Sequence, residues 1–336
     1  MKWLSIFISL ILFTTCQSED KSITSNRASI FDWISAKEEL VHLEINGNLE
    51  HLFVDRSQTD SYHPAMITID RGDSTKQINI EIARRGVTRK KICDFPPIKL
   101  KFPKDTLKKQ GFAKHNNYKL VTHCMDDENE LVLKEYLVYK LFNQLSDKSF
   151  QVKLAKIRYV DDSKTMPADV HYGFLIEDNK ELANRLNGKI LNPQKFKINR
   201  VDKEQYKKMV LFQYMIGNTD WNLSKGHNIK WVQPKDSETP FPVPYDFDYC
   251  GLVNATYAVP HPQIPIKNVR QRFLQWRGKN KEELLPICEA FKAQKSSFMQ
   301  ICEIFEHLKP ETKEDMITFL TSFFEGVDNE LSSERS

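Results

Sequence analysis

The stretch YMIGNTDWNLSKGHNIKWVQPKDSETPFPVPYDFDYCG, residues 214–251, governs the interpretation of the whole chain. Apolar residues lead into a loop whose carboxylate, carboxamide and imidazole groups belong to Asn218, Asp220, Asn222, His227 and Asn228. A second acidic element, Tyr-Asp-Phe-Asp at 245–248, follows after a length that suits a strand, a turn and a returning strand. Polar groups held between buried segments are costly unless something pairs them, and a divalent cation does so. The stretch therefore predicts a metal site; the alternative is a polar turn and an Asp pair that hold no metal.

The order of Asp220, Asn228 and Asp246 matches the order of roles in a kinase-like site. There, one Asp orients the accepting hydroxyl, and an Asn and a second Asp hold the metals that bridge the phosphates. The gap from Asp220 to Asn228 is longer than in the H-R-D-x-x-x-x-N pattern of ordinary protein kinases. The sequence N-T-D-W-N…H-N followed by D-F-D resembles instead the spore-coat-protein-H (CotH) kinase family. The resemblance implies an α+β, two-lobed protein-kinase-like fold with a mainly antiparallel β N-lobe and a mainly helical C-lobe.

The same resemblance implies a role for each polar residue of the stretch. Asp220 is expected to act as the base or orienter of the attacking oxygen. Asn228 and Asp246 are expected to be metal ligands, with Asp248 as a further ligand or a support behind them. This oxygen-rich set favours Mg²⁺ or Mn²⁺ over zinc. The implied phosphate donor is ATP.

Upstream, the alternation at 66–70 and 77–82 around an Arg-Gly-Asp-Ser turn predicts a β-hairpin. Arg85 and Gly86 follow it in a basic turn, and the resemblance implies that they cover the phosphates in place of a glycine-rich loop. The next predicted strand, 98–102, places Lys99 and Lys101 on one face, and either lysine is implied to contact phosphate. The alternative is an exposed turn with solvated charges.

Two further elements complete the implied site. An apolar stripe predicts a helix to about residue 145, and Glu135 within it is implied to pair with the strand lysine, with Glu130 as the alternative. The strands predicted at 152–160 and 172–178 end in a hinge at Glu177, whose backbone is expected to take the adenine. The helix predicted at 201–216, capped by Asp202, delivers the catalytic loop.

Composition limits the function classes. The chain has 336 residues, of which 40% are apolar and 28% charged, which suits a folded protein with a sizeable core. A net charge of +4 is too diffuse to indicate nucleic-acid binding, so no nucleic-acid partner is expected. The predicted division is a signal peptide at 1–16, a flexible tether at 17–28, a β-rich N-lobe at 29–179 and a helical C-lobe at 180–330.

The first residues have the pattern of an export signal. Lys2 precedes an apolar run that is too short for a membrane span, and Phe-Thr-Thr-Cys at 13–16 is typical of a lipobox. The prediction is an exported bacterial lipoprotein, lipidated on Cys16 and facing the periplasm or the cell surface from the outer membrane; plain secretory cleavage is the alternative. Five other cysteines show no zinc spacing, and one or two disulfides are expected without assignable pairing.

Taken together, these patterns predict an exported, metal-dependent phosphotransferase that moves phosphate from ATP to a hydroxyl of a protein acceptor. Transfer of AMP in place of phosphate stays open. The alternatives are a catalytically degenerate lipoprotein that acts as a binding module, and a metal-dependent phosphoesterase that uses the same acids.

Overall fold

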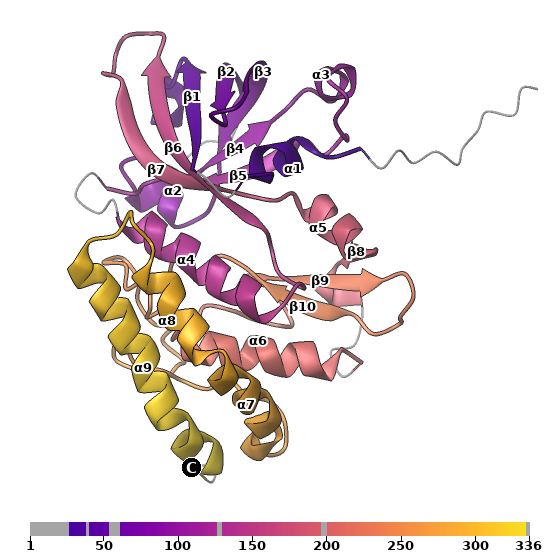
Figure 1. Cartoon of the computed structure of the whole chain (residues 1–336), viewed down its shortest axis with the longest axis vertical. Helices are drawn as coiled ribbons and strands as arrows, with labels where there is room; N and C mark the ends of the chain where they lie inside the picture. Colours follow the sequence, from indigo (N-terminus) through magenta and orange to yellow (C-terminus); the bar gives the residue numbers. More distant parts are fainter. Residues whose placement is uncertain (1–26, 38–39, 54–60, 126–129, 196–199, 334–336) are drawn as a thin grey trace, which may run out of the picture.

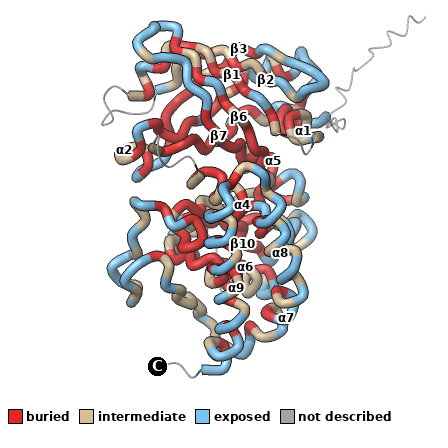
Figure 2. The backbone as a smooth tube through the Cα atoms, turned by 60° about the vertical axis from the view of Figure 1, so that its left-hand side comes forward, coloured by how far each residue is buried: buried red, intermediate tan, exposed pale blue. Residues whose placement is uncertain are grey.

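The computed structural model describes residues 27–37, 40–53, 61–125, 130–195 and 200–333. The predicted signal peptide with Cys16, and all but the last two residues of the predicted tether, lie outside the described residues. Figure 1 shows a β-rich part at the top of the view and a helical part below it. Buried segments run through the strands of the first part and through the middle of the second, so each part has its own core (Figure 2).

Seven strands form the β-rich part: β1 (Val41–Gly47), β2 (His63–Asp70), β3 (Thr75–Arg84), β4 (Ile98–Lys101), β5 (Asn117–Val121), β6 (Val152–Asp161) and β7 (Asp169–Ile176). They close into a barrel in the order β1-β2-β3-β4-β5-β7-β6. The closing pair, β1 with β6, is parallel and runs from Val41 opposite Ala155 to Gly47 opposite Asp161. Apolar residues alternate along the strands, and buried Ile45, Ile67 and Leu100 belong to the core of this part.

The predicted two-lobed protein-kinase-like fold is wrong, because the β-rich part is a closed seven-stranded barrel. The reason lies in β1, whose sequence shows only short β-like alternation. It pairs antiparallel with β2 and parallel with β6, and the second pairing joins segments more than 100 residues apart. Alternation fixes which face of a strand is buried, but not which distant strand closes the sheet. The helical part is also not purely helical, because it contains a three-stranded sheet in the order β10-β9-β8.

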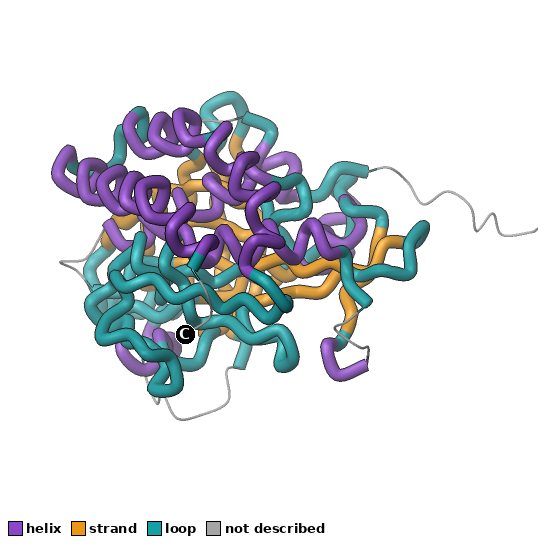
Figure 3. Tube along the Cα trace, turned by 90° about the horizontal axis from the view of Figure 1, so that it is seen from below, coloured by secondary structure: helices purple, strands orange, loops and turns teal. Residues whose placement is uncertain are grey.

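Short helices decorate the barrel: α1 (Ile30–Ser35), η1 (Glu50–Leu52), α2 (Arg89–Ile92) and α3 (Lys104–Lys109). The helical part contains α4 (Glu130–Leu145), α5 (Asn179–Arg185), β8 (Gly188–Leu191), η2 (Pro193–Lys195), α6 (Lys203–Met215), β9 (Ile229–Pro234), β10 (Phe241–Pro244), η3 (Lys281–Leu284), α7 (Leu285–Ala293), α8 (Lys295–Glu303) and α9 (Pro310–Ser332). Helix α4 packs against both β7 and α8, so it joins the two parts. Figure 3 shows the helices on one side of the molecule and long loops on the other.

Several local predictions are confirmed. β2 and β3 form the expected hairpin, with Asp70 opposite Thr75. Helices α4 and α6 cover the predicted segments, and the Asp202 side chain caps α6 by accepting from the Gln205 backbone nitrogen. Within the described residues, none of the helices combines the length and apolar character that a membrane span requires.

Candidate functional site

The polar loop at 217–228 is anchored to the segment that follows the second acidic element. Gly217 ends α6 with a φ of +67°, and a side chain there would press on Phe319 at 3.0 Å. Its carbonyl accepts from the Gly251 nitrogen at 3.0 Å, and the Ile216 carbonyl accepts from the Leu252 nitrogen at the same distance. The two ends of the 214–251 stretch are therefore held together by backbone hydrogen bonds.

Asn218 supports the loop from below. Its side chain is buried, and its amide nitrogen donates to Gln213 at 2.9 Å. Its amide oxygen accepts from the backbone nitrogen of Asp220 at 2.9 Å. A buried carboxamide with both ends paired is a rigid support, so Asn218 fixes the position of Asp220.

The Asp220 carboxylate is held by two neighbours and remains partly open to solvent. The amide nitrogen of Asn228 donates to the Asp220 carbonyl at 2.7 Å and to its Oδ2 at 3.0 Å. The His227 Nε2 lies 3.0 Å from Oδ1, and 36% of the Asp220 side chain is exposed. The hydrogen bond with Asp220 raises the pKa of His227, and the charge of Asp246 adds to this effect. Asp220 is therefore oriented while still reachable from solvent.

The second acidic element lies directly beside this loop. The Tyr245 nitrogen donates to the Asn228 carbonyl at 3.0 Å, and the Asp246 nitrogen donates to the Tyr139 hydroxyl of α4 at 2.9 Å. Phe247 between the two acids is fully buried, and its ring packs on Tyr139 with centroids 4.8 Å apart. The buried aromatic residue thus anchors the element.

Backbone geometry marks both elements. Asn228 has a φ of +54° and Asp246 a φ of +65°, values that residues other than glycine rarely adopt. Asn and Asp tolerate this region best, and such conformations gather at functional sites. Within the 218–248 segment, the non-glycine residues that adopt it are Asn228 and Asp246, two of the three residues that the sequence predicts as metal ligands.

Asp220, Asp246 and Asp248 are here called the acidic cluster, and Asp248 is its most buried member. Asp248 is 6% exposed, and its Oδ2 accepts from the Tyr257 hydroxyl at 3.1 Å. Burial raises the pKa of Asp248 to about 6, and the charges of Asp246 and Asp220 add to the shift, while Arg89 opposes it. The three acids are therefore close enough for the charges of Asp246 and Asp220 to act on Asp248.

Arg85 just beyond β3, Lys119 on β5 and Lys230 on β9 are here called the basic cluster. Lys119 is on β5, with its ammonium 4.2 Å from the ring centre of Tyr245, and Lys230 approaches the same ring at 4.9 Å. Burial lowers the pKa of Lys119 to about 7, the charges of Arg85 and Lys230 lower it further, and Asp246 opposes them. Positive groups and the Asp246 carboxylate therefore lie close enough to act on one another.

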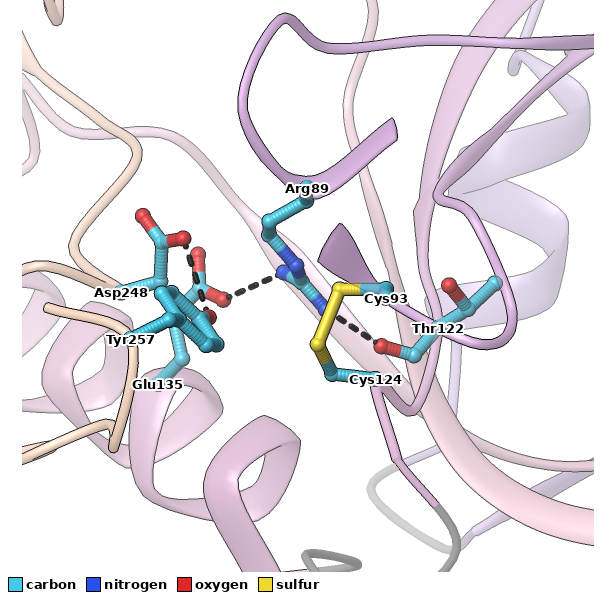
Figure 4. The surroundings of a disulfide bond; sticks show 7 residues. All are labelled: Arg89, Cys93, Thr122, Cys124, Glu135, Asp248 and Tyr257. Atoms are coloured by element: carbon cyan, nitrogen blue, oxygen red, sulfur yellow. Dashed lines mark hydrogen bonds and ion pairs between the residues drawn. A yellow bond between two sulfur atoms is a disulfide. The ribbon is translucent and has the colours of Figure 1, made fainter. Parts of the chain in front are cut away.

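A buried ion pair between Arg89 and Glu135 lies next to Asp248 of the acidic cluster (Figure 4). Arg89 on α2 lies 3.3 Å from the Glu135 carboxylate on α4, and it donates to the Thr122 carbonyl at 2.6 Å. Burial raises the pKa of Glu135 and the charge of Asp248 adds to the shift, while the charge of Arg89 opposes it and favours the ionised carboxylate. Arg89 is thus the counter-charge for Glu135, and it also acts on Asp248.

A disulfide holds α2 in place. Cys93 at the end of α2 is bonded to Cys124 just beyond β5, and the Asp94 nitrogen donates to the Cys124 carbonyl at 2.8 Å. Figure 4 shows the bridge beside Arg89. Cys250, Cys288 and Cys302 are buried, free thiols within the described residues. The one disulfide among the described cysteines therefore fixes the element that carries Arg89.

The structure brings together Asp220, Asn228, Asp246 and Asp248, and Arg85 is buried near enough to Lys119 to act on its charge. Glu135 lies next to the acidic cluster, but its partner is Arg89. Glu130 instead accepts from the Lys309 nitrogen and the Thr312 hydroxyl of α9.

The other predicted residues lie elsewhere. Lys99 is exposed, and Lys101 pairs with Glu81 at 2.6 Å on the barrel surface. Gly86 is exposed with a φ of +86°. The buried Glu177 carboxylate pairs with Arg185 at 2.6 Å and accepts from the Gln151 nitrogen at 2.7 Å.

Lys119 lies at the candidate site, beside Tyr245, but the sequence patterns did not indicate it as a site residue. It lies opposite Lys99 in the β4–β5 register, so the two lysines share one face of the sheet, but only Lys119 contacts Tyr245 of the second acidic element. The sequence feature that could have indicated Lys119 is its position on the strand directly before α4, the helix that carries Glu135.

The ligand atoms that the site offers determine which metal ion it could hold. Within the described residues, no group of three or more His, Cys, Asp or Glu side chains is arranged to hold a metal ion. The atoms present are carboxylate oxygens and the Asn228 amide oxygen, whose nitrogen is committed to Asp220. Such a sparse oxygen set fits Mg²⁺ or Mn²⁺ that arrives with phosphate oxygens and water as its remaining ligands. It does not fit zinc.

Comparison with known proteins gives a distant structural neighbour. No protein-family model and no curated protein sequence matches the chain. Among solved structures, the chain is similar to the Helicobacter pylori proinflammatory kinase CtkA, with 11% sequence identity and a TM-score of 0.41 over 67% of this chain and 89% of that chain. Membership of the CotH family is not shown by these comparisons and stays a prediction.

Proposed function

We propose that the chain is a metal-dependent phosphotransferase that moves a phosphoryl group from ATP to a hydroxyl of a protein acceptor. One observation carries the proposal: Arg85 and Lys119 of the basic cluster come from a different part of the sequence than the acidic cluster, yet the two clusters meet around Tyr245 and Asp246. Phosphoryl transfer depends on positioning and on neutralising phosphate charge, and this arrangement supplies groups of both signs for that purpose.

The acidic cluster and Asn228 would have two roles. Asp220 is oriented by Asn228 and His227 and is partly exposed, which suits a group that accepts a proton from, or orients, an incoming hydroxyl. Asn228, Asp246 and Asp248 would hold Mg²⁺ or Mn²⁺, which when bound neutralises charge on the donor phosphates. Asp248 is the most buried of the acids, so it fixes the inner side of the site.

The basic cluster would receive the phosphates. Lys119 and Lys230 flank one face of the Tyr245 ring, and Arg85 acts on Lys119 electrostatically. A lysine whose pKa is lowered to about 7 by burial regains its charge when a phosphate approaches, because an anion stabilises the ammonium form. Lys119 therefore takes the phosphate-binding role that the sequence alone placed on Lys99 or Lys101.

The proposal extends to location. The lipobox pattern at 13–16 supports export, with lipid attachment at Cys16 holding the chain to a membrane. An acceptor would then be a protein on the same side of that membrane. Fractionation of the bacterial envelope, with and without a Cys16→Ser substitution, tests this part separately.

Labelling with radioactive ATP tests the function. The purified chain and a mixture of acceptor proteins are incubated with ATP labelled at the γ- or the α-phosphate, with Mg²⁺, Mn²⁺ or a chelator. We expect γ-label on protein with either metal, and loss of labelling in Asp220→Asn and Asp246→Asn. Asp105→Asn, an exposed acid on α3, is the matched control and should label normally.

The same assay separates the alternatives. Transfer of α-label would identify AMP as the transferred group, and free phosphate without labelled protein would identify a phosphoesterase. Nucleotide binding without any turnover would identify a binding module. Equal labelling by wild type and Asp246→Asn would remove Asp246 from the site.

A further inference from the structure

The barrel contains a second site, a cavity of about 200 Å³ that shares none of its lining residues with the acidic or basic cluster. Its lining residues are Phe53, Asp94, Phe95, His123, Tyr159, Met166, Pro167, Asp169 and His171. They come from the segments beyond η1, α2 and β5 and from the β6–β7 hairpin. We call this space the aromatic cavity.

The floor of the aromatic cavity is a connected set of rings. Phe95 lies 4.4 Å from Tyr159 and 4.8 Å from His123, measured between ring centres, and His123 stacks on His171 at 3.5 Å with the planes 9° apart. Each of these four side chains is no more than 9% exposed. Flat, buried rings around an open volume favour a flat aromatic ligand.

Two buried polar atoms on this floor have no protein partner among the described residues. They are the Tyr159 hydroxyl and the His123 Nδ1, on side chains that are 3% and 4% exposed. Leaving such atoms unpaired costs free energy, so each is expected to take a hydrogen-bonding partner. Burial lowers the pKa of His123 to about 3, so its ring is neutral at pH 7 and suits a neutral hydrogen-bonding group.

The rim of the cavity is acidic, whereas its floor is aromatic. Asp94 and Asp169 are exposed carboxylates, and Asp169 also contacts His171. The lining contains no lysine or arginine. This charge balance disfavours anions such as nucleotides and favours a ligand with a positive group at its outer end.

We propose that the aromatic cavity binds a small aromatic amine, with the ring on the Phe95–His123 floor, a ring hydroxyl at Tyr159 and the ammonium at the acidic rim. The volume lies below that of pockets for drug-sized molecules, so the ligand is a single ring or a pair of fused rings. The site does not depend on the proposed phosphotransfer.

Calorimetric titration with three probes tests this inference on the purified full chain. Tyramine carries the ring, the hydroxyl and the amine; phenethylamine lacks the hydroxyl; and 4-hydroxyphenylacetate replaces the amine with a carboxylate. We expect saturable one-to-one binding of tyramine, at least tenfold weaker binding of 4-hydroxyphenylacetate, and roughly fivefold to tenfold weaker binding of phenethylamine.

Two variants locate the binding. Tyr159→Phe removes an unpaired buried hydroxyl, so the free protein should stay folded, and tyramine should bind it only as weakly as phenethylamine does. Asp94→Asn, on the exposed rim, should weaken tyramine but not 4-hydroxyphenylacetate. The inference is overturned if tyramine fails to bind, if it binds no better than the carboxylate, or if neither variant changes its affinity.

Discussion

Lys119 combines a half-buried position with a charge, and this combination has a measurable effect on stability. The ammonium lies between aromatic rings, 4.2 Å from the centre of Tyr245 and 5.6 Å from that of Phe150. Its pKa falls from 10.5 to about 7 because burial disfavours the charged form. A proton that the unfolded chain keeps at pH 9 is therefore lost from the native state at that pH.

We predict that Lys119→Met changes the pH dependence of stability. Between about pH 7 and 10.5 the unfolded state binds more protons at this position, so the free energy of unfolding of the wild type rises with pH. The variant lacks this group and should be more stable than the wild type at pH 6, with the advantage shrinking by pH 9. Urea unfolding followed by circular dichroism at the two pH values measures the difference; an unchanged difference would contradict the lowered pKa.

Substitutions of Asp246 distinguish the effect of its carboxylate on phosphoryl transfer from the effect of its backbone conformation on stability. We predict that Asp246→Asn and Asp246→Gly both lower phosphoryl transfer by roughly 10²-fold or more, because each removes a charged ligand. Neither should unfold the chain, since Asn tolerates a φ of +65° and Gly adopts it without strain. Transfer rates and thermal unfolding are measured together. Asp246→Ala, which is strained at this φ, should be the least stable of the three.

At the residue scale the sequence predicts part of the site. The polar loop and the Asp-Phe-Asp element stand out because their polar residues interrupt apolar segments, and the structure places Asp220, Asn228 and Asp246 close together. The basic side is harder to predict. Alternation shows that Lys99, Lys101 and Lys119 each lie on a strand face, but only the barrel register shows which strand borders the acidic cluster.

At the scale of elements, α2 is a short helix of four residues that could not hold Arg89 in place by itself. The Cys93–Cys124 bridge ties it to the end of β5, across a sequence separation of 31. Sequence predicted a disulfide but not this pairing, because spacing alone does not report which cysteines meet in space.

We predict that the double substitution Cys93→Ser with Cys124→Ser lowers the free energy of unfolding by about 3–4 kcal/mol, the cost expected for a loop of this length. Urea unfolding of the wild type in reducing buffer should approach the same value. The variant itself should not respond to the reductant, because the remaining described thiols are free. A wild type whose stability is the same with and without reductant would show that the bridge does not contribute.

The Arg89–Glu135 pair gives a second prediction for the elements α2 and α4. Arg89→Met leaves Glu135 buried without its counter-charge, which costs roughly 3–5 kcal/mol. Adding Glu135→Met removes the unpaired charge, so the double variant should regain much of the loss. A double variant less stable than Arg89→Met alone would show that Glu135 is held by something other than Arg89.

At the scale of the whole molecule, the elements were easier to predict than their assembly. The β2–β3 hairpin, α4 and α6 follow from local alternation and capping, and they appear where expected. The closed barrel does not follow from local patterns, because it depends on the parallel pairing of β1 with β6. The pairings of β5 with β7 and of β6 with β7 bring the β5 end and the β6–β7 hairpin together, and both border the aromatic cavity beside the disulfide.

The central claim is that the acidic and basic clusters form one site for a nucleotide's phosphates and their cation. Calorimetric titration of ATP into the purified chain, with Mg²⁺ and then with a chelator, tests it most directly, using Asp246→Asn as the second sample. The account predicts saturable binding that requires Mg²⁺ and that is lost in the folded Asp246→Asn variant. ATP binding that is equally tight with the chelator and in Asp246→Asn, or no binding by the wild type under any condition, would contradict it.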